Sequence, residues 1–312
     1  MITLAPGPRR ATAVRTLATA LAVGAAVAAC GTAAEAPRPG RSAHAAPAAP
    51  AAPAAHPAPA HPAAPSPAAS SPSPVPALAP DASGLTPVFR NGPRTAGKVV
   101  ALTFDADMTA DEGPRAAAGE HFDNPALIAA LRTLKVPATV FMTGRWAEQY
   151  PAEARSLGTD PQFEVANHSY SHYAFTDDCY GLPTVSGDRM RADVERAYTA
   201  LRAAGVPHPM PYFRFPGGCY DRRALRALGG TGVGTAVQWD VVSGDAFATD
   251  ADAVARQVLD GVRPGSVVVM HCTRSAAPAT ERAVRTVVPA LRAEGYRFVK
   301  VSELIAATEA GR

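Results

Sequence analysis

Polar side chains that could do chemistry follow apolar segments at five places in this chain. These places are residues 105–107, 167–172, 214–220, 239–245 and 271. They carry carboxylates, imidazoles and one guanidinium, which are the groups that active sites use to move protons and to hold metal ions. The five places are therefore the candidates for a functional site.

Two histidines, His168 and His172, are four residues apart. On one helical turn they would point the same way, and two imidazoles with a carboxylate are a common ligand set for a divalent metal. An aspartate from residues 105–107 would complete the set. The spacing alone is a weak signal, because ordinary surface or core histidines also show it. Ser169 stands where a His-Glu-x-x-His metalloprotease has its glutamate, which disfavours that class.

Alternating strand and helix patterns must position these groups. Continuous apolar runs predict strands at 99–104, 138–142, 163–166, 212–215, 235–239, 266–271 and 296–299. Amphipathic segments predict helices at 124–134, 188–204, 222–228, 250–259, 280–294 and 302–307. This alternation indicates parallel strands with crossover helices, in which ligands bind at the carboxyl ends of the strands. It fits a closed barrel or an open sheet, and no glycine-rich phosphate loop follows a strand.

The first 85 residues have the composition of an export signal and a tether. Arginines precede an apolar run at 16–29, which is shorter than the ~20 residues of a membrane-spanning helix, so residues 1–29 are predicted to be a signal peptide. The run ends Val-Ala-Ala-Cys-Gly, which resembles a lipobox, and we expect Cys30 to be lipidated. An ordinary cleavage site beside an unmodified cysteine is the alternative. Residues 30–85 are rich in Ala and Pro and predict a disordered tether, which leaves residues 86–312 as one folded domain.

Charge excludes two classes of partner. The chain has 30 basic and 27 acidic residues, and three of the arginines belong to the predicted signal peptide. The mature chain would be neutral, so it lacks the basic surface that nucleic acids or anionic lipids require. We expect no nucleic-acid partner and contact with a membrane through the lipid anchor only. The four cysteines are too few for a disulfide scaffold.

The motifs resemble those of the NodB-like polysaccharide deacetylases, carbohydrate esterase family four, over residues 98–308. The Thr-Phe-Asp, Asn-His-Ser-x-x-His and Arg-x-Pro motifs, the Asp245 segment and the strand ending at His271 occur in the family's order. The resemblance implies an α/β fold, a distorted (β/α) barrel with one divalent metal. It also implies hydrolysis of N-acetyl or O-acetyl groups on a polymer such as peptidoglycan, chitin or acetylated xylan. Zinc is the expected metal, and cobalt, nickel and manganese are the alternatives.

The first motif departs from the family's Thr-Phe-Asp-Asp, because Ala106 stands at the second aspartate. The resemblance implies that Asp105 is the general base and that Arg214 orients it. Asp107 would then hold the metal together with the two histidines. The reverse assignment, with Asp105 on the metal, stays open.

The resemblance assigns the remaining steps of amide hydrolysis as well. His271 would be the general acid, and Asp245 would raise the pKa of its imidazole. The backbone N–H of Gly217 would bind the oxyanion.

The sugar-binding aromatics of the family are missing at two places, where this chain has Gly217 and Ala246. Tyr220 and Phe247 are the expected substrate-binding residues. Other tyrosines that could take their place are Tyr170, Tyr173 and Tyr180.

The family's barrel would bring two cysteine-bearing loops to one mouth. With export to an oxidising space, we expect a disulfide between Cys179 and Cys219. Cys272 follows His271 at a strand end, so it should face away from the site as a buried free thiol.

The sequence therefore predicts an exported, metal-dependent deacetylase of a cell-wall or extracellular glycan, held on the outer face of the membrane as a lipoprotein or secreted. We expect a monomer. The main alternative is a catalytically inactive relative that binds glycan as a tethered module, and its only support is the changed aspartate motif. A metalloprotease or an unrelated hydrolase is a weaker alternative.

Overall fold

The computed structural model describes residues 75–80 and 82–311 of the 312-residue chain. The predicted signal peptide, Cys30 and most of the predicted tether lie outside the described residues. Contacts with the folded part begin before residue 86, because the Tyr212 hydroxyl donates to the Pro76 carbonyl at 2.7 Å and the Leu78 N–H donates to Thr235 Oγ1 at 3.1 Å. In the described part of the chain, no helix combines the length and the apolar character that a membrane crossing needs.

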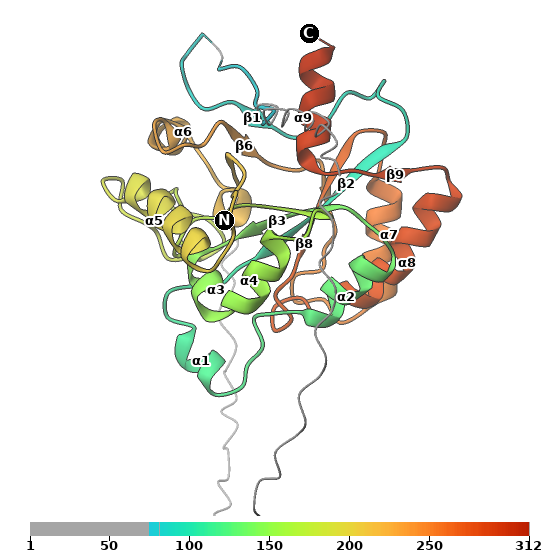
Figure 1. Cartoon of the computed structure of the whole chain (residues 1–312), viewed down its shortest axis with the longest axis horizontal. Coiled ribbons are helices and arrows are strands. Elements are labelled where there is room, and N and C mark those ends of the chain that lie inside the picture. Colours follow the sequence, from blue (N-terminus) through green and yellow to red (C-terminus); the bar gives the residue numbers. More distant parts are fainter. Residues whose placement is uncertain (1–74, 81, 312) are drawn as a thin grey trace, which may run out of the picture. The chain divides into compact units, whose positions relative to one another are not determined.

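Nine strands form a single sheet within the described residues, and every strand pair in it is parallel. The strand order is β1-β6-β5-β4-β3-β2-β8-β7, with β9 beside β2 (Figure 1). The strands are β1 (Val88–Phe89), β2 (Val99–Ala106), β3 (Ala138–Met142), β4 (Phe163–Asn167), β5 (Tyr212–Phe213), β6 (Thr235–Val237), β7 (Val241–Val242), β8 (Ser266–His271) and β9 (Arg297–Phe298).

The sheet curls because consecutive strands lie near its two opposite edges. β6 pairs with β5 near one edge and β7 pairs with β8 at the other, and only three residues, 238–240, connect them. That short connection forces the two edges together, and β1 lies beside β6 at the junction. The result is a curled half-barrel of parallel strands with helices outside it, which confirms the predicted distorted (β/α) barrel.

The helices lie between the strands in sequence, as parallel pairing requires. They are α1 (Gly113–Ala117), α2 (Pro125–Thr133), α3 (Gly144–Gln149), α4 (Pro151–Gly158), α5 (Met190–Ala203), α6 (Arg222–Leu228), α7 (Ala251–Gly261), α8 (Thr280–Ala293) and α9 (Val301–Ala310). A 3₁₀ turn covers Pro216–Gly218. The sequence pattern did not predict α1, α3 or α4, each of which buries at most one large apolar side chain and so shows no apolar stripe.

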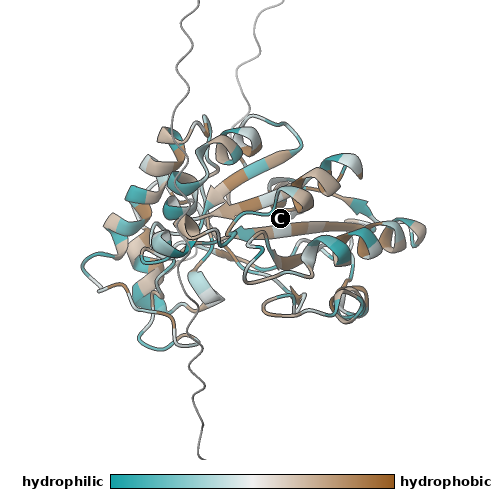
Figure 2. Cartoon of the chain, turned by 90° about the horizontal axis from the view of Figure 1, so that it is seen from below, coloured by the Kyte–Doolittle hydropathy of each residue, from teal (hydrophilic) through white to brown (hydrophobic). Residues whose placement is uncertain are grey.

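The strands are apolar on both faces because each face borders a separate apolar cluster. Along β2, Leu102, Phe104 and Ala106 pack in the large cluster between the sheet and the helices, whereas Val99 and Ala101 pack in the smaller cluster inside the barrel. Figure 2 shows this hydrophobic character as brown in the central strands. Because side chains alternate along a strand, residue 105 points to the inside of the barrel.

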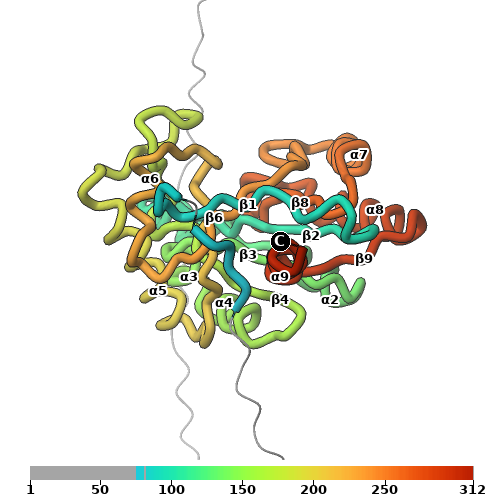
Figure 3. The backbone as a smooth tube through the Cα atoms, turned by 90° about the horizontal axis from the view of Figure 1, so that it is seen from above, coloured from blue at the N-terminus to red at the C-terminus, as the bar shows by residue number. Residues whose placement is uncertain are grey.

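The amino ends of the strands are closed by α9 (Figure 3). Its Val301, Leu304 and Ile305 belong to the inner cluster. Buried Glu164 accepts hydrogen bonds from the Thr139 hydroxyl at 2.7 Å and the Ser302 N–H at 3.1 Å, which fixes the start of the helix. This packing closes the interior of the barrel at its amino end, and the polar segments lie at the opposite end.

Candidate active site

The register of the sheet brings the five polar segments to one end of the barrel. Asp105 and His271 are direct partners on the neighbouring strands β2 and β8, and Asn167 on β4 is the partner of Phe213 on β5. Each of these residues is at or near the carboxyl end of its strand. Side chains from five segments therefore meet at one mouth, as the sequence predicts.

A buried ion pair joins Asp105 to Arg214. Arg214 Nη1 donates to Asp105 Oδ1 at 2.6 Å, and the guanidinium lies over the Phe141 ring, 3.9 Å from its centroid, with the Trp239 ring centroid 5.3 Å away. Arg214 is fully buried, and Asp105 is 4% exposed. Burial lowers the pKa of Arg214, while the charge of Asp105 and its hydrogen bond raise it. The guanidinium thus fixes the orientation of this carboxylate.

His168 is held as a neutral imidazole in one tautomer. Its Nδ1 lies 2.9 Å from the Arg214 backbone carbonyl, which can only accept, so Nδ1 carries the proton and Nε2 keeps its lone pair. Nε2 lies 3.7 Å from Asp105 Oδ2. Burial lowers the pKa of His168 to about 4, against the opposing charge of Asp105. An uncharged, oriented imidazole is the form that binds metal ions.

The second histidine faces the second aspartate. His172 Nε2 lies 3.6 Å from Asp107 Oδ2, and the Thr273 hydroxyl donates to Asp107 Oδ1. Burial raises the pKa of Asp107, but the charges of His172 and His271 and the Thr273 hydrogen bond outweigh it and lower the pKa. Asp107 is therefore an anion at neutral pH.

The segment with the two histidines is a loop and not a helical turn, so the expected helical spacing is wrong. Ser169 and His172 both have left-handed backbone, with φ of 70° and 57°. The His172 N–H donates to Ser169 Oγ at 3.0 Å, which stabilises the bend. The loop still brings the two rings together, with centroids 5.0 Å apart.

The donor set at this mouth fits a divalent metal by its chemistry. It contains a neutral imidazole with a free Nε2, a second imidazole, and carboxylates held by hydrogen bonds from other groups. The histidine–carboxylate distances of 3.6 and 3.7 Å exceed a hydrogen bond and approach the about 3.3 Å between two ligands of a tetrahedral zinc site. Within the described residues, no group of three or more His, Cys, Asp or Glu side chains stands close enough together to hold a metal ion without some adjustment.

His271 is held as a charged imidazolium. Its Nδ1 and its backbone N–H lie 2.8 and 2.7 Å from the two oxygens of Asp245, a carboxylate that is 1% exposed. Burial lowers the pKa of His271, but the charge and hydrogen bond of Asp245 raise it to about 10. The Ser243 and Thr280 hydroxyls also donate to Asp245, so this carboxylate has a complete set of donors. Because Nδ1 of His271 bonds to Asp245, Nε2 is the nitrogen that can donate a proton to a ligand.

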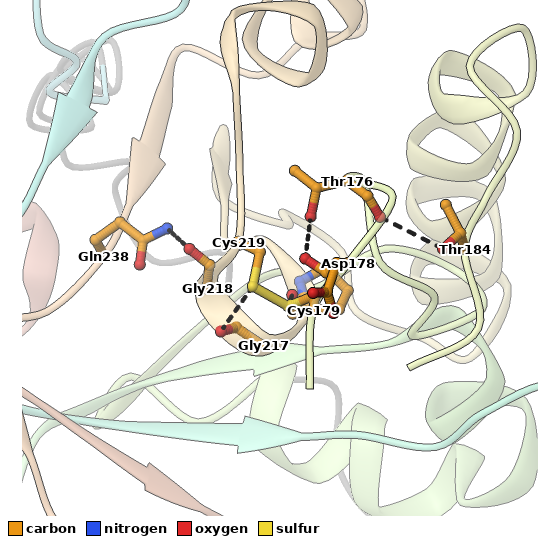
Figure 4. Close-up of a disulfide and its surroundings, with 9 residues drawn as sticks. Thr176, Asp178, Cys179, Thr184, Gly217, Gly218, Cys219 and Gln238 are labelled. Atoms are coloured by element: carbon orange, nitrogen blue, oxygen red, sulfur yellow. Dashed lines mark hydrogen bonds between the residues drawn. A yellow bond between two sulfur atoms is a disulfide. The ribbon is translucent and has the colours of Figure 1, made fainter. Parts of the chain in front are cut away.

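Gly217 lies in a turn that is tied to a second loop by a disulfide (Figure 4). The structure has the predicted bond between Cys179 and Cys219, and Cys272 is a buried free thiol as expected. Gly217 has φ of 63°, and a Cβ on it would lie 2.6 Å from Cys179 Sγ. Glycine is therefore required at this position both by the backbone and by the disulfide.

A cavity of about 240 Å³ lies beside the second aspartate and the second histidine of the site. Its lining includes Asp107, His172, Leu182, Phe247 and Thr273. Phe247 lines this cavity, whereas Tyr220 does not. The Tyr220 ring stacks on Phe215 with centroids 5.4 Å apart, and its hydroxyl accepts from Arg90 at 2.7 Å.

The sequence motifs do not include the hydroxyl groups that donate to the carboxylates of the site. Thr273, Ser243 and Thr280 each donate to an aspartate of the site. Thr273 and Ser243 are two residues from His271 and Asp245, a spacing that could have drawn attention to them. Thr280 begins α8, and no local pattern marks it.

Comparison with known proteins gives the same family as the motifs. A family model described as "Polysaccharide deacetylase" matches residues 92–236. A chitooligosaccharide deacetylase of Sinorhizobium fredii is 31% identical over 168 residues, which are 53% of this chain and 70% of the relative. A peptidoglycan-N-acetylglucosamine deacetylase of Bacillus cereus is 24% identical over 209 residues, which are 67% of this chain and 88% of the relative.

A solved structure has the same fold. The Bc1960 peptidoglycan N-acetylglucosamine deacetylase superposes with a TM-score of 0.58 at 24% identity, over 71% of this chain and 94% of that one. The half-barrel and its helices are thus those of a known fold.

Replacement of Asp245 by Asn should lower the pKa of His271. The imidazolium loses its charged partner, so we expect its titration midpoint to fall from about 10 toward the ordinary 6.5. Asp245 raises the folded-state pKa of His271, so its contribution to stability is complete below about pH 6.5 and is lost as the pH rises through 10. Histidine NMR titration measures the midpoint, and thermal unfolding at pH 6 and pH 10 measures the loss. Thr280→Val, which removes only one hydrogen bond to Asp245, is the matched control. An unchanged midpoint in Asp245→Asn would exclude Asp245 as the cause.

Proposed function

Because this chain belongs to the polysaccharide deacetylase family, we propose that it removes acetyl groups from the amino sugars of a cell-wall or extracellular glycan. The chain is a hydrolase that acts on carbon–nitrogen bonds other than peptide bonds. The names of its relatives point to chitooligosaccharide or peptidoglycan as the polymer. One observation carries the proposal most directly: Asp105, held by Arg214, and His271, charged by Asp245, are partners on adjacent strands.

We assign a residue of this site to each step of amide hydrolysis. Asp105 takes a proton from the attacking water as the water oxygen bonds to the acetyl carbon, and Arg214 keeps the carboxylate oriented. His271 gives its proton to the departing nitrogen as the carbon–nitrogen bond breaks, which leaves acetate and a free amine. Asp245 stabilises the imidazolium until that step. The Gly217 N–H is proposed to bind the oxygen that becomes negative.

A divalent metal fits beside these groups. We propose that Asp107, His168 and His172 hold it, with zinc as the expected ion and cobalt, nickel or manganese as alternatives. The neutral state of His168 and the anionic state of Asp107 support this set. When bound, such an ion polarises a carbonyl and lowers the pKa of water.

The position of Ala106 supports an active enzyme over an inactive glycan-binding relative. Its side chain packs in the apolar cluster between sheet and helices, on the face away from the site. Asp107, one residue later, lies beside His172. The changed motif therefore does not remove a carboxylate from the site.

Acetate release tests the proposed function. Purified protein with added zinc should release acetate from N-acetylated chitooligosaccharides or from peptidoglycan, measured by an enzyme-coupled acetate assay. Asp105→Asn is the matched negative control because it keeps the side-chain volume and removes the base. Absence of acetate from every acetylated polymer, with glycan still bound, would support the inactive alternative.

Separate Asn substitutions of the two aspartates should have different effects. We expect Asp107→Asn to weaken zinc affinity by ~10-fold or more because it removes a charged ligand, whereas Asp105→Asn should keep zinc and lose turnover. Zinc binding by calorimetry and acetate release separate the two roles. The opposite pattern would exchange the roles, and full activity in both variants would contradict the mechanism.

We also propose export and a lipid anchor at Cys30, on the sequence pattern that surrounds it. The Cys179–Cys219 disulfide supports an oxidising compartment. Mass spectrometry of the membrane-extracted protein should find diacylglycerol on an N-terminal cysteine. A peptide that reads through Ala29 and Cys30, or release without lipid, would contradict the anchor.

A further inference from the structure

Two exposed aromatic side chains stand at the mouth of the barrel. In the described part of the chain, the large hydrophobic side chains exposed to solvent are Val75, Tyr180, Val242 and Phe247. Tyr180 is 89% exposed and Phe247 is 83% exposed. Phe247 lines the cavity beside His172, and so does Leu182, which closes the turn that carries Tyr180. The exposed aromatic side chains of the described residues are thus both next to the candidate active site.

Tyr180 and Phe247 both have a backbone conformation that aromatic residues rarely adopt. Tyr180 has φ of 51° and Phe247 has φ of 59°. Tyr180 and Gly181 are the two central residues of a turn closed by the Leu182 N–H, which donates to the Cys179 carbonyl at 3.0 Å. With φ above zero at both central positions, the turn prefers Asn, Asp or Gly at residue 180. A bulky aromatic there costs stability, and it gains no burial in return.

The loop that presents Tyr180 is fixed at both ends. At its base, the Ala174 N–H donates to the Pro183 carbonyl at 2.7 Å, and the Val185 N–H donates to the Ala174 carbonyl at 2.9 Å. At its tip, the disulfide of Cys179 joins it to the turn that holds Gly217 (Figure 4). The ring is therefore presented to solvent on a backbone that does not need to be ordered when a ligand binds.

Tyr180 occupies the space beside Gly217. A Cβ on Gly217 would lie 3.5 Å from Tyr180 Cδ2 and 3.3 Å from Leu182 Cδ1. The side chains of this loop thus cover the position from which a side chain at residue 217 would extend. Tyr220 is the aromatic residue that the sequence favoured. Its ring instead stacks on Phe215, and its hydroxyl accepts a hydrogen bond from Arg90.

We propose that Tyr180 and Phe247 are two stacking surfaces for sugar rings of the acetylated glycan, with Tyr180 in the place of an aromatic at residue 217. The inference rests on the proposed function, because it assigns a binding role at the same cavity. A pyranose ring has a flat apolar face of C–H bonds, which packs on the negatively charged face of an aromatic ring. Each ring stands on its own loop, and in this proposal each stacks on its own sugar, so the site takes a chain of at least two sugars and binds a single sugar poorly.

Substitution of Tyr180 by Asn separates binding from folding. Asn suits positive φ, so the turn should keep or gain thermal stability while the stacking surface is lost. We expect the Kd for chitopentaose, measured by calorimetry on the zinc-loaded protein, to rise about 10-fold, the size of effect seen for an anchoring aromatic. Tyr180→Phe keeps the ring and should bind as the wild type does. Phe247→Asn should give a loss of similar size, and Val75→Ala, an exposed apolar side chain that does not line the cavity, should change neither binding nor acetate release.

The outcomes distinguish this inference from the proposed function. Weaker binding of chitopentaose by Tyr180→Asn, with unfolding temperature kept and with recovery in Tyr180→Phe, supports the stacking role even if the wild type releases no acetate. A Kd within twofold of the wild type in both Asn variants overturns it, even if the wild type is an active deacetylase. Failure of the wild-type protein to bind any of the oligosaccharides overturns it as well.

Discussion

The buried ion pair between Arg214 and Asp105 is the interaction on which the rest of the site depends. A fully buried guanidinium needs a compensating charge, and removal of one partner of such a pair costs about 3–5 kcal/mol. Arg214 also joins three parts of the barrel. Its side chain bonds to Asp105 on β2, its Nε donates to the Val237 carbonyl of β6 at 3.3 Å, and its own carbonyl accepts from His168 after β4. One residue thus aligns the proposed base, one proposed metal ligand and the strand at which the barrel closes.

Neighbouring groups give His168 and His271 opposite states. His168 is buried and donates to a neutral carbonyl, so burial dominates and its pKa falls to about 4. His271 donates to the Asp245 carboxylate, so charge overcomes burial and its pKa rises to about 10. Near neutral pH, one imidazole can bind a metal ion and the other can give a proton. A hydrolytic site needs both states at once. The hydrogen-bond acceptor of each Nδ1, a neutral carbonyl or a carboxylate, decides which histidine has which state.

The sequence predicted the elements whose apolar pattern begins and ends clearly. The strand at 138–142 and the helix at 222–228 have the predicted bounds, because an apolar run or a capped apolar stripe defines both ends. The cysteine pair followed from the barrel that the family resemblance implies, which brings the two loops to one mouth. Short elements such as α3 and the connection from β6 to β7 could not be predicted, because packing against the rest of the barrel determines them. For the same reason the sequence could not choose among the tyrosines: Tyr220 and Tyr180 differ in what surrounds them, not in their local pattern.

Backbone strain is concentrated at the proposed site. In the described residues, non-glycine positions with positive φ are Lys135, Ser169, His172, Tyr180 and Phe247, and all except Lys135 belong to the loops around the mouth. Glycine or asparagine would suit these φ values better, and a chain selected for stability alone would have them there. Instead the chain has an imidazole at one of these positions and exposed aromatic rings at two others. The cost in stability is borne in the loops around the mouth, which is the pattern expected when ligand binding, and not folding, determines the residue.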